Sequence, residues 1–211
     1  PMKTLPVAVQ VYSVREDAEK DFAGTMKKIK EIGYDGVELA GLYGLQPAAI
    51  KAAIEDAGLV ALSAHVPFQE LVADMEGTIQ KYVEIGMKYI AIPYLMEEDR
   101  PGTPKFEGNV KLFEEIAKAC KAKGIQLLYH NHDFEFQNLA AGRYPLDYIS
   151  DTLTPDLLPT DVDPSRATVA STAPAAYLPT HPRLSPLVHP PDLHPAAHTS
   201  TPHPTHHAPA T

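Results

Sequence analysis

In the first 130 positions, short apolar runs alternate with segments in which apolar residues recur at helical spacing. This alternation predicts strands separated by helices. The predicted strands are short apolar runs at residues 7–12, 36–39, 60–65, 89–92 and 125–129. The predicted helices, in which apolar residues recur every three or four positions, cover residues 21–32, 47–57, 73–85 and 109–123. Five strands with four intervening helices predict a parallel sheet with right-handed crossovers.

Glycine marks the predicted passages from helix to strand. The glycines at these places are Gly33, Gly58, Gly86 and Gly124. Glycine readily adopts the left-handed conformation that closes a helix, so we expect each of them at or just after a helix end. Asn109 is expected to cap the last helix at its N-terminus.

Two architectures fit this order of elements, an open doubly wound sheet and an α/β (β/α)8 TIM barrel. Residues 13–17, which follow the first strand, lack the glycine-rich turn that an open nucleotide-binding sheet usually shows. Polar or ionisable residues instead stand at the ends of successive strands: Gln10, Tyr12, Glu38, His65, Tyr94, His130 and His132. A barrel enzyme builds its site at these strand ends, so the pattern favours the barrel.

The composition of the chain changes after residue 142. All 12 glycines precede this point, whereas residues 143–211 contain 14 of the 21 prolines and 7 of the 10 histidines. Proline at this density breaks helices and central strands. We therefore expect a barrel portion with strands one to six over residues 1–163. A tail rich in Pro, His, Thr and Ala follows over 164–211, with a remnant of strand seven at 186–189. The tail is low-complexity disordered sequence, a frameshifted product or an incorrectly assigned stretch.

Charge and cysteine content exclude several classes of protein. The net charge of −9 argues against a general nucleic-acid binder. A single cysteine excludes an internal disulfide framework and a zinc site of several cysteines. No run of about 18 apolar residues is present, so we expect no membrane-spanning helix and no membrane partner. The N-terminal residues lack the apolar core of a secretory signal, and we expect a cytoplasmic protein.

Residues 127–136 hold the densest group of chemically active side chains. In a strand, His130 and His132 share one face with Leu128. Imidazoles with Asp133 and Glu135 close by suit a divalent metal such as Zn, Mn or Co. The alternative is a pair of hydrogen-bonded structural histidines at a strand end.

Glu38 and His65 end the second and third predicted strands. A carboxylate at an inward strand end is costly unless it is paired or used. A salt-bridged glutamate and a structural histidine therefore remain alternatives to a role in substrate contact.

Four short segments occur in the order and at the spacing of a barrel: VQVYSVR at 9–15, GYDGVE at 33–38, SAHVP at 63–67 and YHNHDFEF at 129–136. Together they resemble the sugar phosphate isomerase/epimerase family, the xylose isomerase-like TIM barrels, over about residues 5–158. The resemblance implies an eight-stranded barrel with one divalent metal ion, Zn, Mn, Co or Mg, at its C-terminal mouth. It also implies proton transfer next to a carbonyl of a sugar, sugar phosphate or cyclitol.

The resemblance also implies roles for individual residues. The segments TDVD at 160–163 and SPLVHPPD at 185–192 are similar to strands six and seven of the family, which carry metal ligands. The implied metal ligands are Glu135, Asp163 and His189. The implied catalytic residues are Glu135, Glu38 and His65, and the implied substrate contacts are Tyr12, His65, His130 and His132. The glutamate that strand eight normally supplies has no counterpart.

Two other functions remain open at this point. A noncatalytic barrel that binds a sugar would not need the missing ligand of strand eight. A DNA-repair endonuclease of the endonuclease IV type shares the barrel, but its basic DNA groove does not fit the acidic charge. We expect a small-molecule sugar ligand and no nucleic-acid partner, and leave a homo-oligomer open.

Overall fold

The computed structural model of the chain describes residues 7–130, 149, 153 and 156–161. Its strands are β1 (Ala8–Gln10), β2 (Gly36–Leu39), β3 (Val60–His65), β4 (Tyr89–Ile92), β5 (Gln126–His130) and β6 (Thr160–Asp161). Each strand pairs in parallel with the next one along the chain, in the order β1 to β6. This sequential order, with β1 at an edge, confirms the wall of a TIM barrel, because an open doubly wound sheet would place β1 in its middle.

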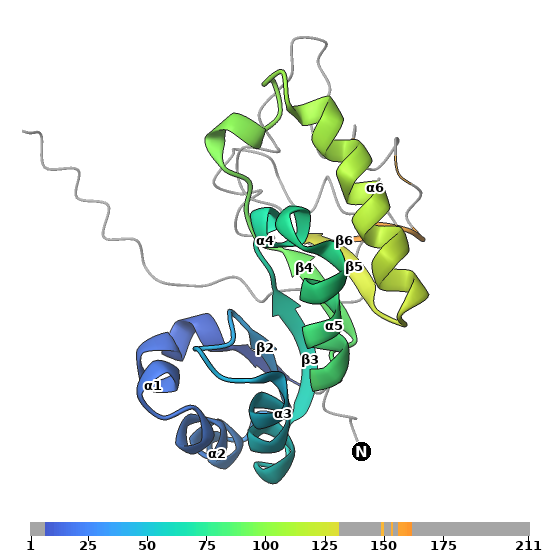
Figure 1. Cartoon of the computed structure of the whole chain (residues 1–211). Coiled ribbons are helices and arrows are strands. Elements are labelled where there is room, and N and C mark those ends of the chain that lie inside the picture. Colours follow the sequence, from blue (N-terminus) through green and yellow to red (C-terminus); the bar gives the residue numbers. More distant parts are fainter. Residues whose placement is uncertain (1–6, 131–148, 150–152, 154–155, 162–211) are drawn as a thin grey trace, which may run out of the picture.

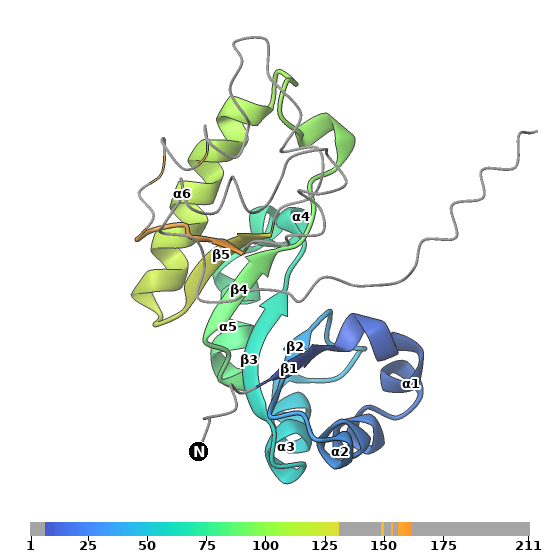
Figure 2. The same cartoon turned by 180° about the vertical axis from the view of Figure 1, so that it is seen from behind.

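Helices cover one side of this wall (Figures 1 and 2). They are α1 (Arg15–Lys20), α2 (Phe22–Ile32), α3 (Pro47–Asp56), α4 (Phe68–Ala73), α5 (Met75–Ile85) and α6 (Phe106–Ala122), with short 3-10 turns η1 (Val11–Val14) and η2 (Glu97–Asp99). No helix within the described ranges is long and apolar enough to cross a membrane.

The core lies between the sheet and these helices. Val37, Ile90 and Leu127 from the strands are fully buried in one cluster with Phe113 of α6. Cys120 belongs to the same cluster, and burial raises the pKa of its thiol to about 12. This cysteine is therefore a packing residue that stays protonated at neutral pH.

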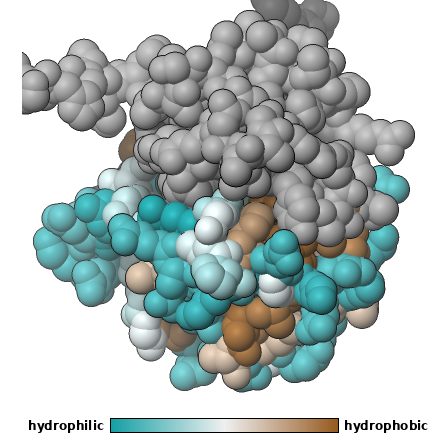
Figure 3. Space-filling view, turned by 90° about the horizontal axis from the view of Figure 1, so that it is seen from above, coloured by the Kyte–Doolittle hydropathy of each residue, from teal (hydrophilic) through white to brown (hydrophobic). Residues whose placement is uncertain are grey.

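Much of the described surface is hydrophilic, with hydrophobic residues between the polar ones on the face seen from above (Figure 3). Among the residues that the structure describes, Ile32 is the most exposed large apolar side chain, at 74%. Scattered apolar side chains are ordinary on a soluble fold and mark no interface by themselves.

The helix ends agree with the sequence analysis at the four glycines. All four have a positive φ, between 72° and 113°. Gly33 and Gly86 directly follow the last helical residue, and Gly58 and Gly124 follow it with one residue in between. Three of the predicted strands have the bounds that the structure shows: residues 36–39 form β2, residues 60–65 form β3 and residues 89–92 form β4. The first strand is shorter than predicted, because the chain turns into η1 at Val11.

The predicted cap at Asn109 is wrong. Helix α6 begins three residues earlier, and Asn109 is a buried residue inside it. Its amide nitrogen donates hydrogen bonds to a carboxylate oxygen of Asp99 at 3.1 Å and to the Asp99 carbonyl at 3.2 Å. The side-chain amide of Gln69 donates a hydrogen bond to the other carboxylate oxygen of Asp99, at 3.2 Å. This cluster ties the segment after β4 to α4 and α6.

Two junctions between helices share one local design. Asp21 and Asp74 each follow one helix and cap the next, accepting a hydrogen bond from the amide of Gly24 at 2.9 Å and of Gly77 at 3.0 Å. The predicted helix 73–85 corresponds to α5 and begins two residues later, because Ala73 ends α4 and Asp74 forms the junction. A Cβ atom at either glycine would collide with the capping carboxylate. A larger residue at either position would therefore displace the capping carboxylate.

Substitution Gly77→Ala is expected to destabilise the protein, because the new methyl group displaces Asp74 from its cap. The loss of a cap costs about 0.5–2 kcal/mol of unfolding free energy. Gly108→Ala is the matched control, since a Cβ there meets no atom within 4 Å in α6. The control is expected to gain about 0.5–1 kcal/mol, because alanine favours a helix over glycine. Urea denaturation of both variants tests this, and equal stability of the two would contradict it.

The division of the chain at residue 163 is only partly covered by the structure. Strand six is present as β6, two residues before Asp163. The tail over 164–211, with its predicted remnant at 186–189, lies outside the described residues.

Candidate functional site

A buried carboxylate joins the C-terminal ends of the first three strands. Glu38 of β2 is 4% exposed and accepts a hydrogen bond from the Gln10 amide of β1 at 2.9 Å. It also accepts one from the hydroxyl of Ser63 in β3. Its Oε1 atom lies 3.1 Å from Nε2 of His65, at the end of β3. Three neighbouring strands thus supply one connected polar cluster.

An irregularity in the sheet makes this cluster possible. The pairing of β2 with β3 shifts by one residue between Val37 and Glu38, so that Glu38 stands opposite Ser63 instead of Leu62. Ser63 and His65 are two positions apart in a strand and share a face. The shift therefore brings both side chains to the carboxylate. Gln10 pairs directly with Glu38 across β1 and β2 and needs no such shift.

The contacts of Glu38 set the tautomer of His65. An ionised carboxylate only accepts hydrogen bonds, so Glu38 favours a proton on Nε2 of His65. Nδ1 is then the acceptor of the ring. The Gln10 amide nitrogen lies 3.4 Å from Nδ1 and 3.5 Å from Nε2, so the tautomer rests on the contact with Glu38 alone.

His130 and His65 form a second contact across the barrel wall. His130 ends β5 and is 8% exposed. Its ring centre lies 5.0 Å from that of His65, with the planes tilted by 52°. Both imidazoles therefore face the same space at the C-terminal ends of the strands.

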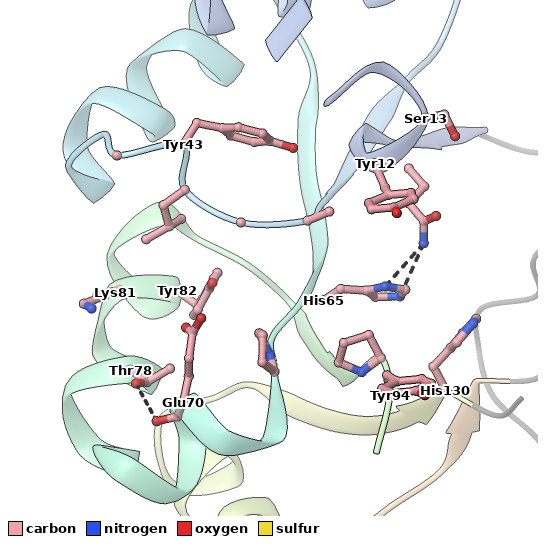
Figure 4. A pocket seen from close by; sticks show the side chains of 17 residues that line it. Tyr12, Ser13, Tyr43, His65, Glu70, Thr78, Lys81, Tyr82, Tyr94 and His130 are labelled. Carbon is pink, nitrogen blue, oxygen red and sulfur yellow. Dashed lines mark hydrogen bonds between the residues drawn. The ribbon is translucent and has the colours of Figure 1, made fainter. Parts of the chain in front are cut away.

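That space is a cavity of about 710 Å³ (Figure 4). Its inner part is lined by Gln10, Tyr12, His65, Pro67, Tyr94 and His130. Its outer part runs along the loop from β2 to α3 and along α4 and α5, where Tyr43, Glu70, Thr78, Lys81 and Tyr82 line it. Cavities of this size accommodate small ligands.

Two tyrosines stand at the mouth of the inner part. Tyr12 is 55% exposed, and the guanidinium of Arg15 lies 4.3 Å from its ring centre. Tyr94 is 42% exposed, and the guanidinium of Arg100 lies 4.8 Å from its ring centre. Aromatic rings combine an apolar face with a polar hydroxyl, a surface that suits a sugar ring.

The structure places the candidate residues in three groups. Tyr12, His65 and His130 line one cavity, as substrate contacts would. Glu38 does not line the cavity but contacts His65, which does. His132, Glu135, Asp163 and His189 lie outside the described residues.

Three further residues of the site had no role predicted from the sequence: Gln10, Ser63 and Tyr94. Gln10 and Tyr94 were recognisable as polar residues at strand ends. Ser63 carried one signal, its position two residues before His65, but the shift in pairing that brings it to Glu38 leaves no trace in the sequence.

The described residues alone do not form a metal site. Among them, no group of three or more His, Cys, Asp or Glu side chains is arranged to hold a metal ion. Both oxygens of Glu38 already accept hydrogen bonds from Gln10 and Ser63. A metal would need ligands from beyond this part of the chain.

Solved structures show the same fold, while no protein-family model and no curated protein sequence matches the chain. A sugar phosphate isomerase/epimerase from Parabacteroides distasonis is 21% identical, with a TM-score of 0.76 over 95% of this chain and 83% of that one. A second structure of that description and organism has a TM-score of 0.73 at 21% identity, over 90% and 76% of the chains. A 3-keto-D-glucoside 4-epimerase from E. coli has a TM-score of 0.56 at 19% identity, over 81% and 73%.

These similarities confirm, at the level of the fold, the resemblance on which the sequence analysis relied. Together with a xylose isomerase domain protein from Planctomyces limnophilus, they place this chain among the xylose isomerase-like TIM barrels by architecture. At identities of 14–21%, these similarities show that the chain shares the fold of these proteins and do not show that it shares their activities.

Proposed function

We propose that this chain, whose fold is that of the xylose isomerase-like TIM barrels, is a sugar or cyclitol isomerase or epimerase that moves a proton next to a carbonyl. The observation that carries the proposal is the Glu38–His65 pair, with a contact of 3.1 Å, at the C-terminal mouth of the barrel. His65 lines a polar cavity there, and its partner carboxylate is buried behind it.

Such a pair suits proton transfer. Glu38 favours the proton on Nε2 and fixes the orientation of the ring, so Nδ1, which lies 3.4 Å from the Gln10 amide nitrogen, is the atom that would take up a proton from a substrate carbon in place of that contact. Histidine exchanges protons readily near neutral pH, which is the property that a general base needs. The ring centre of His130 lies 5.0 Å from that of His65. In this proposal the His130 imidazole binds the substrate hydroxyl next to the reacting carbon.

The names of structural neighbours support this class of reaction. Besides the isomerase/epimerase structures, a D-psicose 3-epimerase solved with D-fructose has a TM-score of 0.52 at 16% identity. An AP endonuclease of family 2 from Brucella melitensis also shares the fold, with a TM-score of 0.57 at 13% identity. The net charge of −9 favours the sugar over the nucleic acid as ligand.

A divalent metal ion, Zn, Mn, Co or Mg, is part of the proposal. Glu135, Asp163 and His189 are the proposed ligands, on the strength of the sequence resemblance. When bound, the ion would polarise the substrate carbonyl and make the neighbouring carbon more acidic. His130 pairs with Asp161 between β5 and β6, and Asp163 follows two residues later in the sequence.

Solvent exchange tests the proposed function. The full chain is incubated in D2O with a panel of ketoses and inosose-type cyclitols and with added Mn²⁺ or Co²⁺. Deuterium is expected to appear on a carbon next to the carbonyl of at least one compound. If no compound exchanges while some still bind, the chain is a sugar-binding barrel without proton-transfer activity.

A further inference from the structure

We propose that the outer part of the cavity is a second sugar subsite, so that the substrate carries a second, uncharged sugar ring. This subsite lies between the β2–α3 loop and helices α4 and α5, and its polar side chains are those of Tyr43, Glu70, Thr78, Lys81 and Tyr82. The proposal rests on the proposed function for the first ring, whose carbonyl faces His65.

The size and continuity of the cavity are the first support. One continuous space of about 710 Å³ extends from His65 and His130 to Tyr82. A single six-carbon sugar held at the imidazoles fills only a fraction of this volume. The remainder is a compartment that opens from the reaction site and leads outward between two segments of the barrel (Figure 4).

Tyr82 provides the second support. The residue is 2% exposed and lines the cavity, and its hydroxyl forms no hydrogen bond to another described residue. Burial and the nearby charge of Glu70 raise the pKa of Tyr82 to about 12, so the hydroxyl keeps its proton. Because Tyr82 lines the cavity, a ligand oxygen there can accept a hydrogen bond from its hydroxyl.

The charges of the compartment favour a neutral ligand. Glu70 and Lys81 are both exposed and bring one negative and one positive charge to it. Neither forms a salt bridge with another described residue. Sugar hydroxyls donate to a carboxylate and accept from an ammonium group, so one sugar ring satisfies both. A phosphate group would gain from Lys81 but meet repulsion from Glu70.

The opposite wall of the compartment is a strained loop. Tyr43 has φ of 53° between Gly41 and Gly44, whose φ values are also positive. Its hydroxyl is buried without a hydrogen-bond partner in the described part of the chain, and its ring lies 5.7 Å from that of Phe22. A residue other than glycine in this conformation costs about 1–3 kcal/mol, and such strain is typical of binding walls.

Binding measurements with defined sugars test the subsite. Calorimetry on the full chain with Mn²⁺ compares D-fructose with turanose, maltulose and isomaltulose, three glucosyl-fructoses that differ only in linkage. At least one disaccharide is expected to bind about 10-fold more tightly than D-fructose. Tyr82→Phe is expected to raise the Kd of that disaccharide about 5–10-fold, the effect of one hydrogen bond, and to leave D-fructose unchanged. Tyr34→Phe, at a partly buried tyrosine outside the cavity, is the control and should change neither Kd.

Three results would overturn the subsite: no disaccharide binds more tightly than D-fructose, Tyr82→Phe weakens both sugars equally, or D-fructose 6-phosphate binds best and loses its advantage in Lys81→Met. The last result would identify an anion site. Failure of the proposed function is distinguishable, because it is measured by proton exchange. A selective, Tyr82-dependent disaccharide site without exchange would leave the subsite standing and refute the catalytic proposal.

Discussion

His65→Gln is expected to slow deuterium exchange into the substrate by about 10²–10⁴-fold, the usual cost of losing a general base. Glutamine can still donate a hydrogen bond to Glu38 through its amide, so the buried carboxylate keeps a partner. The amide cannot take up a proton near neutral pH, which is the one property that the reaction needs. The fold is expected to survive, because His65 stands at the end of β3 and not in the apolar core.

His130→Gln is the comparison for this variant. Its ring lies 5.0 Å from that of His65 in the same cavity, so both substitutions disturb the same space. We expect the His130 variant to change the substrate KM more than the rate of exchange at saturation. If His65→Gln exchanges protons as fast as the parent while His130→Gln does not, the roles of the two imidazoles are reversed.

The strands of the barrel wall were predictable because they are short apolar runs between segments of helical periodicity. Helix α4 was not, because Phe68 and Leu71 are its only large buried residues and six residues show little periodicity. The N-terminus of α6 was misplaced for a different reason. Asn109 has the residue type of a cap, but it lies inside the helix and its amide donates a hydrogen bond to the Asp99 carboxylate.

Of the candidate site, too, one part was predictable from the sequence and another was not. The positions of Glu38 and His65 at strand ends followed from the pattern, since parallel strands bring their C-terminal ends to one edge. Their contact did not follow, because it depends on the one-residue shift between Val37 and Glu38. Tyr82 lay in an apolar helical stripe and gave no signal of a cavity, since the loop that faces it is 40 residues away in the chain.

Glu38→Gln is expected to lower the exchange rate about 100-fold and to destabilise the protein. The amide presents two donor hydrogens where Gln10, Ser63 and His65 all direct donors to the carboxylate. At least one buried donor is then left without an acceptor, which costs about 1–3 kcal/mol. The exchange rate falls because Nε2 of His65 no longer has an anion that favours its proton, and the ring can hold it on Nδ1 instead. Under the proposed function, Glu38 is a positioning residue whose effect on the reaction passes through the tautomer of His65.

Nitrogen-15 NMR of the histidine rings separates this role from a merely structural one. In the parent protein the His65 spectrum is expected to show the Nε2–H tautomer, and in Glu38→Gln a mixture of both. Ser63→Ala is the matched variant, because it removes one donor to Glu38 and leaves the contact with His65 intact. It should keep the parent tautomer and lose less than about 10-fold in rate, the effect of one hydrogen bond. An unchanged tautomer in Glu38→Gln together with a full loss of stability would show that Glu38 only holds the strands together.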